Sequence, residues 1–203
     1  MKVKHMNKFV AHCDRCFQQK IDFVAHMVGE NGIHVDVLVY EPNETYPFWK
    51  LVTMGASDYD MAPVQPTFGL NNEYVMFADK SVDLKDENIF KWYYDKLINV
   101  ATFAYFNDTH VTYGNSFYVN RLDDEDEMVY CFIEIPQIIR EVSFLHCKVG
   151  FSKVITCLQV VLLNEEEVEK LKDMGGERFS YWLNPESEQD EHFIVEKKRT
   201  EKF

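Results

Sequence analysis

Residues 34–61, HVDVLVYEPNETYPFWKLVTMGASDYDM, decide the fold. Side chains from residue 34 to residue 40 alternate between two faces, a period of two that is typical of a β-strand. One face carries Val35, Val37 and Val39, and the other carries His34, Asp36, Leu38 and Tyr40. Pro42 and Asn43 favour a turn, and residues 48–53 form a second aromatic and β-branched run. Met54-Gly55-Ala56-Ser57, rich in small residues, then allows a sharp bend, so the stretch predicts two strands and a bend.

The chain on both sides of this stretch predicts further helices and strands. Apolar residues recur at intervals of three and four within residues 1–28 and again over residues 89–106, which indicates two amphipathic helices. The remaining expected elements are strands near 73–80, 109–120, 128–135 and 142–163, a short helix with a capping box at Asn164 that ends at Gly175–Gly176, and a helical piece over 178–183. The predicted fold class is α+β, a mixed and mostly antiparallel β-sheet with helices packed on it.

The order and spacing of these segments resemble a known family. His-Val-Asp-Val at 34–37, the Pro-containing turn, and Leu-Val-Thr-Met-Gly-Ala-Ser at 51–57 are similar to the suppressor of fused (SUFU) domain family in its stand-alone bacterial form. The other matching segments, spread over about residues 20–183, are Asn72–Met76 around Glu73, Ile89–Phe106, Asn107–Thr109, Tyr113–Asn115, Ile155–Leu163, Asn164–Glu167 and Gly175–Gly176. Departures at Asn71, Phe77–Asp79 and Asn115 indicate a divergent member of that family.

Length and composition bound the organisation of the chain. Its 203 residues, 46% hydrophobic and 15% aromatic, have the composition of a folded protein. We expect one SUFU-like domain over residues 1–185 and a charged, frayed tail over residues 186–203. The N-terminus has no apolar signal core and no run of 18 apolar residues occurs, so a cytoplasmic location is expected. Five cysteines without a disulfide framework indicate free thiols.

The charge of the chain points to the class of partner. The net charge is −13, and residues 1–50 hold six acids and six bases, so all of the excess lies beyond residue 50. A negative field of this kind repels nucleic acid and anionic membranes and attracts basic proteins, and it can raise association rates by roughly 10 to 10³. Solubility alone is the other explanation of the charge.

Two clusters have the residue types of metal or thiol chemistry. His12, Cys13 and Cys16 supply at most half of a zinc site, and both cysteines fall on the apolar stripe of the first helix, which favours core packing. Adjacent His146 and Cys147 point to opposite faces of a strand and cannot form a nucleophile–base pair with each other. We therefore expect no catalytic residue, no metal ligand and no cofactor.

The candidate partner-binding residues lie in two places. The first is the exit from the bend, Asp58, Tyr59, Asp60 and Met61, and the second is the acidic run Asp123, Asp124, Glu125, Asp126 and Glu127. The run has neither the ligand spacing nor the central glycine of a calcium loop, so a solvated hairpin turn or a docking surface for a basic protein is expected. His34 and Asp36 share a strand face, which predicts a structural hydrogen bond between them.

The resemblance implies binding instead of catalysis. SUFU-type domains are implied to sequester a partner protein in animals and to act as immunity proteins against polymorphic toxins in bacteria. An acidic single domain is expected to fill the second role and to block a basic toxin. Two alternatives remain: a scaffold module that binds an extended peptide along a sheet edge, and an enzyme, either Cys-dependent through Cys147 or using a His/Asp pair.

Overall fold

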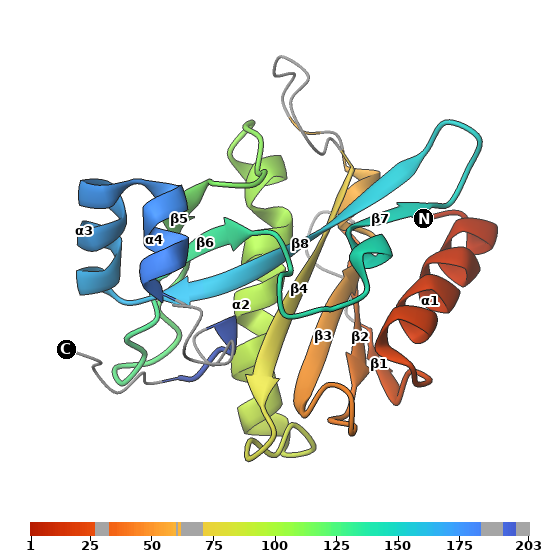
Figure 1. Ribbon diagram of the computed structural model, residues 1–203, viewed down its shortest axis with the longest axis horizontal. Helices are drawn as coiled ribbons and strands as arrows, with labels where there is room; N and C mark the ends of the chain where they lie inside the picture. Colours follow the sequence, from red (N-terminus) through yellow and green to blue (C-terminus); the bar gives the residue numbers. More distant parts are fainter. Residues whose placement is uncertain (27–32, 60, 62–70, 184–192, 198–203) are drawn as a thin grey trace.

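A mixed eight-stranded sheet forms the centre of the molecule (Figure 1). The computed structural model describes residues 1–26, 33–59, 61, 71–183 and 193–197. The strands are β1 (Phe23–Ala25), β2 (Asp36–Tyr40), β3 (Phe48–Met54), β4 (Asn72–Asp79), β5 (Ser116–Tyr118), β6 (Tyr130–Glu134), β7 (His146–Lys148) and β8 (Val154–Leu163). Their order is β1-β2-β3-β4-β8-β6-β5, with β7 also paired to β8. Among these described strands β4 and β8 run parallel and the other pairs antiparallel, which confirms the predicted fold class.

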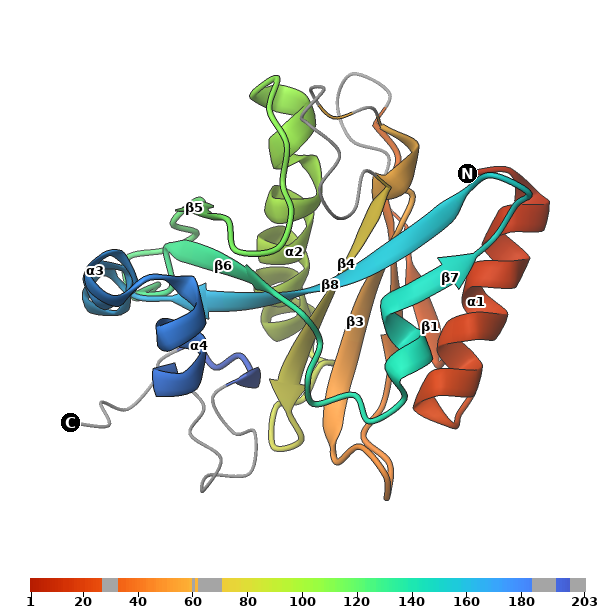
Figure 2. The ribbon, with the colours of Figure 1, turned by 45° about the horizontal axis from the view of Figure 1, so that its top comes forward.

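Helices cover both faces of the sheet. They are α1 (Val3–Phe17), α2 (Glu87–Phe106), α3 (Glu165–Met174) and α4 (Gly176–Leu183), with 3-10 turns η2 (Ala56–Asp58) and η3 (Val142–Leu145). The long α2 packs on one face, whereas α1 and the α3–α4 pair pack at the two ends of the other face (Figure 2). No helix in the described ranges is both long and apolar enough to span a membrane.

The two faces of the sheet bury separate hydrophobic cores. Val37 and Val39 of β2 pack in the core beneath α2, and Leu38 and Tyr40 pack in the core beneath α1. This alternation confirms the period of two that the sequence shows from residue 34 to residue 40. Because every residue of β2 and β3 is buried, this hairpin lies between the two cores and joins them.

The N-terminal region differs from its prediction. Helix α1 ends at Phe17, and Gln18 closes it in the left-handed conformation. Residues 23–25 then form the short edge strand β1, within the stretch 1–28 whose apolar spacing predicted a helix. Pairing with β2 makes these residues a strand despite their helical spacing. The sequence did not reveal it, because three residues are too few to show the alternation of a strand.

The C-terminal segment also differs from its prediction where the structure describes it. Phe193 and Val195 are fully buried, one in each core. The Val195 N–H donates to Phe77 O of β4 at 2.7 Å, and Gln159 Nε2 of β8 donates to Phe193 O at 2.9 Å. The expectation of a frayed tail is therefore wrong for residues 193–195, because two apolar side chains dock there. The domain boundary at residue 185 stays a prediction.

Candidate functional site

A buried carboxylate shapes the bend that follows β3. Glu73 on β4 accepts hydrogen bonds from the Thr53 hydroxyl at 2.7 Å and from the backbone N–H groups of Gly55, Ala56 and Ser57 at 2.9, 3.2 and 3.1 Å. Burial raises the pKa of Glu73, although these donors work against the shift. The carboxylate thus fixes the backbone from which the Asp58–Met61 segment leaves the sheet.

Asp58 is occupied by contacts within the chain. Its carboxylate pairs with Lys153 Nζ at 2.7 Å and with the α-amino group of Met1, and the same Nζ donates to Ser57 O at 2.9 Å. Partial burial would raise the pKa of Asp58, but the two cations outweigh burial and lower it. A partner that used Asp58 would have to compete with these ion pairs, so the residue is a weaker contact candidate than its sequence position suggested.

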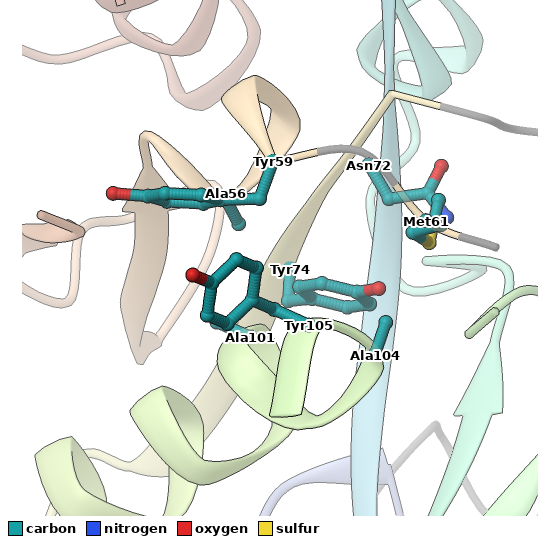
Figure 3. Close-up of a pocket in the computed structure, with 8 residues that line it drawn as sticks. All are labelled: Ala56, Tyr59, Met61, Asn72, Tyr74, Ala101, Ala104 and Tyr105. Atoms are coloured by element: carbon teal, nitrogen blue, oxygen red, sulfur yellow. The ribbon is translucent and has the colours of Figure 1, made fainter. Parts of the chain in front are cut away.

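Tyr59 and Met61 border a pocket between η2, β4 and the C-terminal part of α2. Figure 3 shows Tyr59 on one side, Tyr105 of α2 beneath it, and Met61 beside Asn72 on the other side. The Tyr59 and Tyr105 rings are 5.5 Å apart, edge to face, and Met61 Sδ accepts from the Val111 N–H at 3.5 Å. The pocket is small and partly enclosed, with a volume of about 10 Å³. Asp60, the remaining candidate of this segment, lies outside the described residues.

The acidic turn is exposed at four of its five positions. Asp123, Asp124, Glu125 and Glu127 all face solvent, as a docking surface requires. Asp126 does not, because its side chain is fully buried. We therefore correct the sequence interpretation and remove Asp126 from the contact candidates. A run of five consecutive Asp and Glu residues contains no sequence signal that one side chain points inward.

Asp126 holds the turn onto α2 through a buried ion pair. Its Oδ2 lies 2.6 Å from Lys96 Nζ, and both side chains are completely inaccessible to solvent. The same Nζ donates to Asn120 O at 2.7 Å and to Met128 O at 2.6 Å, on the two sides of the turn. Burial lowers the pKa of Lys96, although Asp126 works against that shift. One lysine thus fixes both ends of the turn and keeps the four exposed carboxylates in a defined arrangement.

An open groove lies beside the acidic turn. Its volume is about 600 Å³, and Asp123 of the turn forms part of its wall. The rest of the lining is Ser81, Val82, Asp83, Asn88, Ile89, Trp92, Tyr93 and Lys197. Lys197 pairs with Asp123 at 2.8 Å, and this pair is half-exposed. The lining therefore combines apolar side chains with two carboxylates and one lysine, and nothing in the sequence pointed to this groove.

The thiol candidates belong to the core. All five cysteines are buried, and burial raises the pKa of Cys147 to about 11. Cys13 and Cys16 pack in the core beneath α1, as their helical spacing predicted. His12 Nε2 lies 3.3 Å from Phe144 O, and burial lowers the pKa of His12. His146 is exposed on the opposite face of β7 from Cys147, as expected for neighbours in a strand.

The predicted contact between His34 and Asp36 is present, with His34 Nε2 3.0 Å from Asp36 Oδ1. A third side chain, His26, joins it at 2.7 Å from the same oxygen. Sequence reasoning missed His26 because it follows the short strand β1, and only the pairing of β1 with β2 brings it beside Asp36. A prediction of that edge strand and its register would have found it.

Solved structures share the fold of this chain, and three of them illustrate the likeness. A SUFU homologue from Neisseria gonorrhoeae FA 1090 matches with a TM-score of 0.64 and 11% identity, over 96% of this chain and 94% of that chain. The structure of the Sufu–Fu complex matches with a TM-score of 0.66 and 10% identity, over 94% of this chain and 88% of that chain. Drosophila Suppressor of Fused matches with a TM-score of 0.66 and 12% identity, over 94% of this chain and 49% of that chain. Identities this low show the fold alone, and no curated protein matches the chain.

A match to a family model decides the classification. The model described as Suppressor of fused protein (SUFU) matches residues 31–199, which include the β2–β3 hairpin, the bend and the acidic turn. This match spans most of the chain and confirms the resemblance drawn from residues 34–61. The chain belongs to the suppressor of fused family.

Proposed function

We propose that this chain is a non-catalytic immunity protein that acts in the cytoplasm and neutralises a basic toxin by binding it. The observation that carries the proposal is the acidic turn, in which the buried Lys96–Asp126 pair presents four exposed carboxylates. The bacterial role that the family resemblance implies supports it, as does the Sufu–Fu complex, in which a protein of this fold is bound to another protein.

A fixed turn suits the capture of a basic protein. Carboxylates that are already held in place lose little conformational entropy on binding, so more of the electrostatic attraction appears as affinity. The net charge of −13 adds long-range steering, which raises the association rate at low salt. We expect an interface of about 1,600 Å² that covers the active site of the toxin.

The groove beside the turn supplies the apolar part of such an interface. Strong interfaces bury a few anchoring side chains in a pocket and surround them with polar groups. Ile89, which is 40% exposed, lines the groove together with the mostly buried Trp92 and Tyr93, and Asp83 and Asp123 belong to the same lining. The stem of a toxin arginine or lysine would find an apolar contact at Ile89, and its charge would find the exposed Asp83 carboxylate.

The test is growth rescue with the product of the neighbouring gene. The products of the adjacent genes are expressed one at a time, with and without this chain, and growth and co-purification are measured. We expect one product to arrest growth and wild-type chain to restore it and to bind that product. The variant Asp123→Asn, Asp124→Asn, Glu125→Gln and Glu127→Gln is expected to associate at least ~10-fold more slowly at low salt.

A second variant with the same net charge serves as the control. It carries Glu44→Gln, Asp108→Asn, Asp173→Asn and Glu177→Gln, four exposed positions away from the turn. We expect it to associate several-fold faster than the turn variant. Equal rates for the two variants would show that only total charge matters and would remove the turn from the interface. The proposal fails altogether if no neighbouring product is toxic, or if the chain neither rescues growth nor binds.

The sheet edge favours one alternative, a module that binds an extended peptide. Strand β5 is the last in the sheet order, and its Ser116 and Tyr118 are exposed. A peptide could add a strand there, held by backbone hydrogen bonds and side-chain pockets instead of charge. Binding by a short peptide that persists in ~1 M salt, where the Debye length falls to about 3 Å, would favour this alternative.

A Cys-dependent enzyme is the remaining alternative, and its chemistry fits poorly. A reactive cysteine needs an exposed thiolate in electropositive surroundings. Cys147 is 3% exposed, and burial raises its pKa to about 11. Measured turnover of any substrate that is lost in Cys147→Ala would overturn this assignment.

A further inference from the structure

Three ligand-type side chains converge where the end of β1 meets the start of β2. His26 Nδ1 lies 2.7 Å from Asp36 Oδ1, His34 Nε2 lies 3.0 Å from the same oxygen, and the two nitrogens are 3.1 Å apart. The pairing of Ala25 with Val37 brings His26 opposite Asp36. In the ranges that the structure describes, no other three His, Cys, Asp or Glu side chains converge so closely.

Hydrogen bonding accounts for only part of this arrangement. One oxygen of Asp36 can accept from both imidazoles, but both nitrogens must then carry hydrogens. His26 Nδ1 and His34 Nε2 would face each other as two donors at 3.1 Å, with no acceptor between them. A cation in place of those hydrogens turns all three close approaches into favourable contacts.

We propose that His26, His34 and Asp36 form a binding site for one divalent transition-metal ion. Two ligand atoms, each ~2.1 Å from a metal, lie ~3.0 Å apart when they subtend about 90° and ~3.4 Å apart in a tetrahedron. The three separations of 2.7, 3.0 and 3.1 Å match the first geometry. The side chains therefore occupy one triangular face of an octahedron, and three positions remain open.

The donor set decides which ions fit. Imidazole suits Zn²⁺, Ni²⁺, Cu²⁺ and Fe²⁺, whereas Mg²⁺ and Ca²⁺ prefer sites made of oxygen ligands. Two imidazoles and one carboxylate therefore select for the transition metals. Asp36, with its side chain 8% exposed, forms the base of the site, while His26 and His34 are 59% and 46% exposed. Solvent thus reaches the positions that the three side chains leave open.

The site is joined to the rim of the Tyr59–Met61 pocket. The backbone N–H of His34 donates to the Tyr59 hydroxyl at 2.5 Å, and Tyr59 lines that pocket. A bound ion would hold the end of β1 against β2 and would fix the orientation of His34 beside Tyr59. This inference does not depend on the proposed immunity function, because metal binding is measured without a partner.

The test is metal titration of the full chain, without a polyhistidine tag and after treatment with EDTA and desalting. We expect isothermal titration with ZnCl₂ or NiCl₂ to give about one ion per chain, and MgCl₂ to give no binding. Loss of an outer-sphere partner already weakens metal binding by about 10- to 100-fold, so His26→Ala and His34→Ala should each weaken it by at least ~100-fold. Zinc should also raise the melting temperature of the wild-type chain and not that of these variants.

Matched variants separate this site from adventitious binding. His146→Ala removes an exposed histidine on β7, outside the triad, and should leave affinity and stoichiometry unchanged. Asp36→Asn keeps the size of the side chain and should weaken metal binding. If this variant fails to fold, the variants His26→Ala and His34→Ala, at exposed positions, decide the result. Zinc binding that is unchanged in His26→Ala, or absent from the wild-type chain, would overturn the proposal and leave a hydrogen-bonded cluster.

Discussion

At the scale of single residues, Gly55 fixes the bend that follows β3. Its φ is +126°, and a Cβ at this position would lie 2.6 Å from His34 O. The substitution therefore adds a backbone clash to an unfavourable conformation. We expect Gly55→Ala to lower the free energy of unfolding by about 3 kcal/mol in urea denaturation.

Gly114 provides the matched control for this prediction. Its φ is +83°, but no atom lies within 4 Å of the Cβ that alanine would add. Gly114→Ala should therefore cost only the backbone conformation, about 1 kcal/mol. Equal losses at the two positions would show that the contact with His34 O does not matter.

Lys50 gives the chain a pH dependence of stability. Its side chain is fully buried, its Nζ donates to Glu41 O at 2.5 Å, and burial lowers its pKa to about 8. Between about pH 8 and pH 10.5 the unfolded chain keeps a proton that the folded chain has lost, so this contribution to stability rises with pH. The Lys50→Met variant lacks this pH-dependent contribution to stability.

Denaturant unfolding of wild type and Lys50→Met at pH 7, 8.5 and 10 measures this effect. The difference in unfolding free energy between the two proteins should change in favour of the wild type as the pH rises. Taking the difference cancels the titration of other groups, and Lys148→Met at an exposed position of β7 controls for the loss of one charge. A difference that does not change with pH would contradict the assignment.

At the scale of elements, the Lys96–Asp126 pair joins α2 to the acidic turn. Lys96→Met leaves the Asp126 carboxylate buried without its cation and frees the carbonyls on both sides of the turn. We expect a loss of about 3–5 kcal/mol in unfolding free energy, because an unpaired buried charge is very unfavourable. Thermal and urea unfolding measure it.

A double-mutant cycle isolates the ion pair from the rest of this loss. Asp126→Asn should be less harmful than Lys96→Met, and the double variant should cost clearly less than the sum of the two. Coupling of about 1–3 kcal/mol is expected for residues in direct contact. Additive losses would mean that the pair does not hold the turn.

The elements that the sequence predicted well are those with local signals. Asn164 with Glu167 forms the predicted capping box that starts α3, and α2 begins with a similar local cap at Asp86, which accepts from the Asn88 and Ile89 N–H groups. Both signals are complete within four residues. Strand β1 has no such signal, because three residues become a strand only through pairing with β2.

At the scale of the whole molecule, the segment 193–195 closes both cores. Phe193 is 1% exposed and Val195 is fully buried between β4 and α2, where the Tyr93 hydroxyl donates to Val195 O at 3.2 Å. We expect Phe193→Ala to destabilise the chain by about 3–5 kcal/mol. The control is Phe151→Ala at a fully exposed position, which should change stability by less than ~0.5 kcal/mol. Similar small effects of both substitutions in calorimetry would show that the segment does not dock.

The candidate surface could be predicted only in part. Sequence reasoning located the acidic run from its charges, because a run of like charges is avoided in a core. It could not tell that Asp126 turns inward, since the deciding residue, Lys96, lies thirty positions earlier on α2. The groove beside the turn was also missed, because its lining comes from the β4–α2 connection, α2, the turn and Lys197.

The sequence by itself determined the family, the fold class and the residues that bury each face of the central hairpin. These depend on alternation, capping and spacing, which are local properties that a chain carries before it folds. The tertiary structure alone decided which polar residues meet: His26 with Asp36, Lys96 with Asp126, and Glu73 with the bend. Such contacts join residues distant in sequence, and one step of strand register or a small rotation of a helix would separate them.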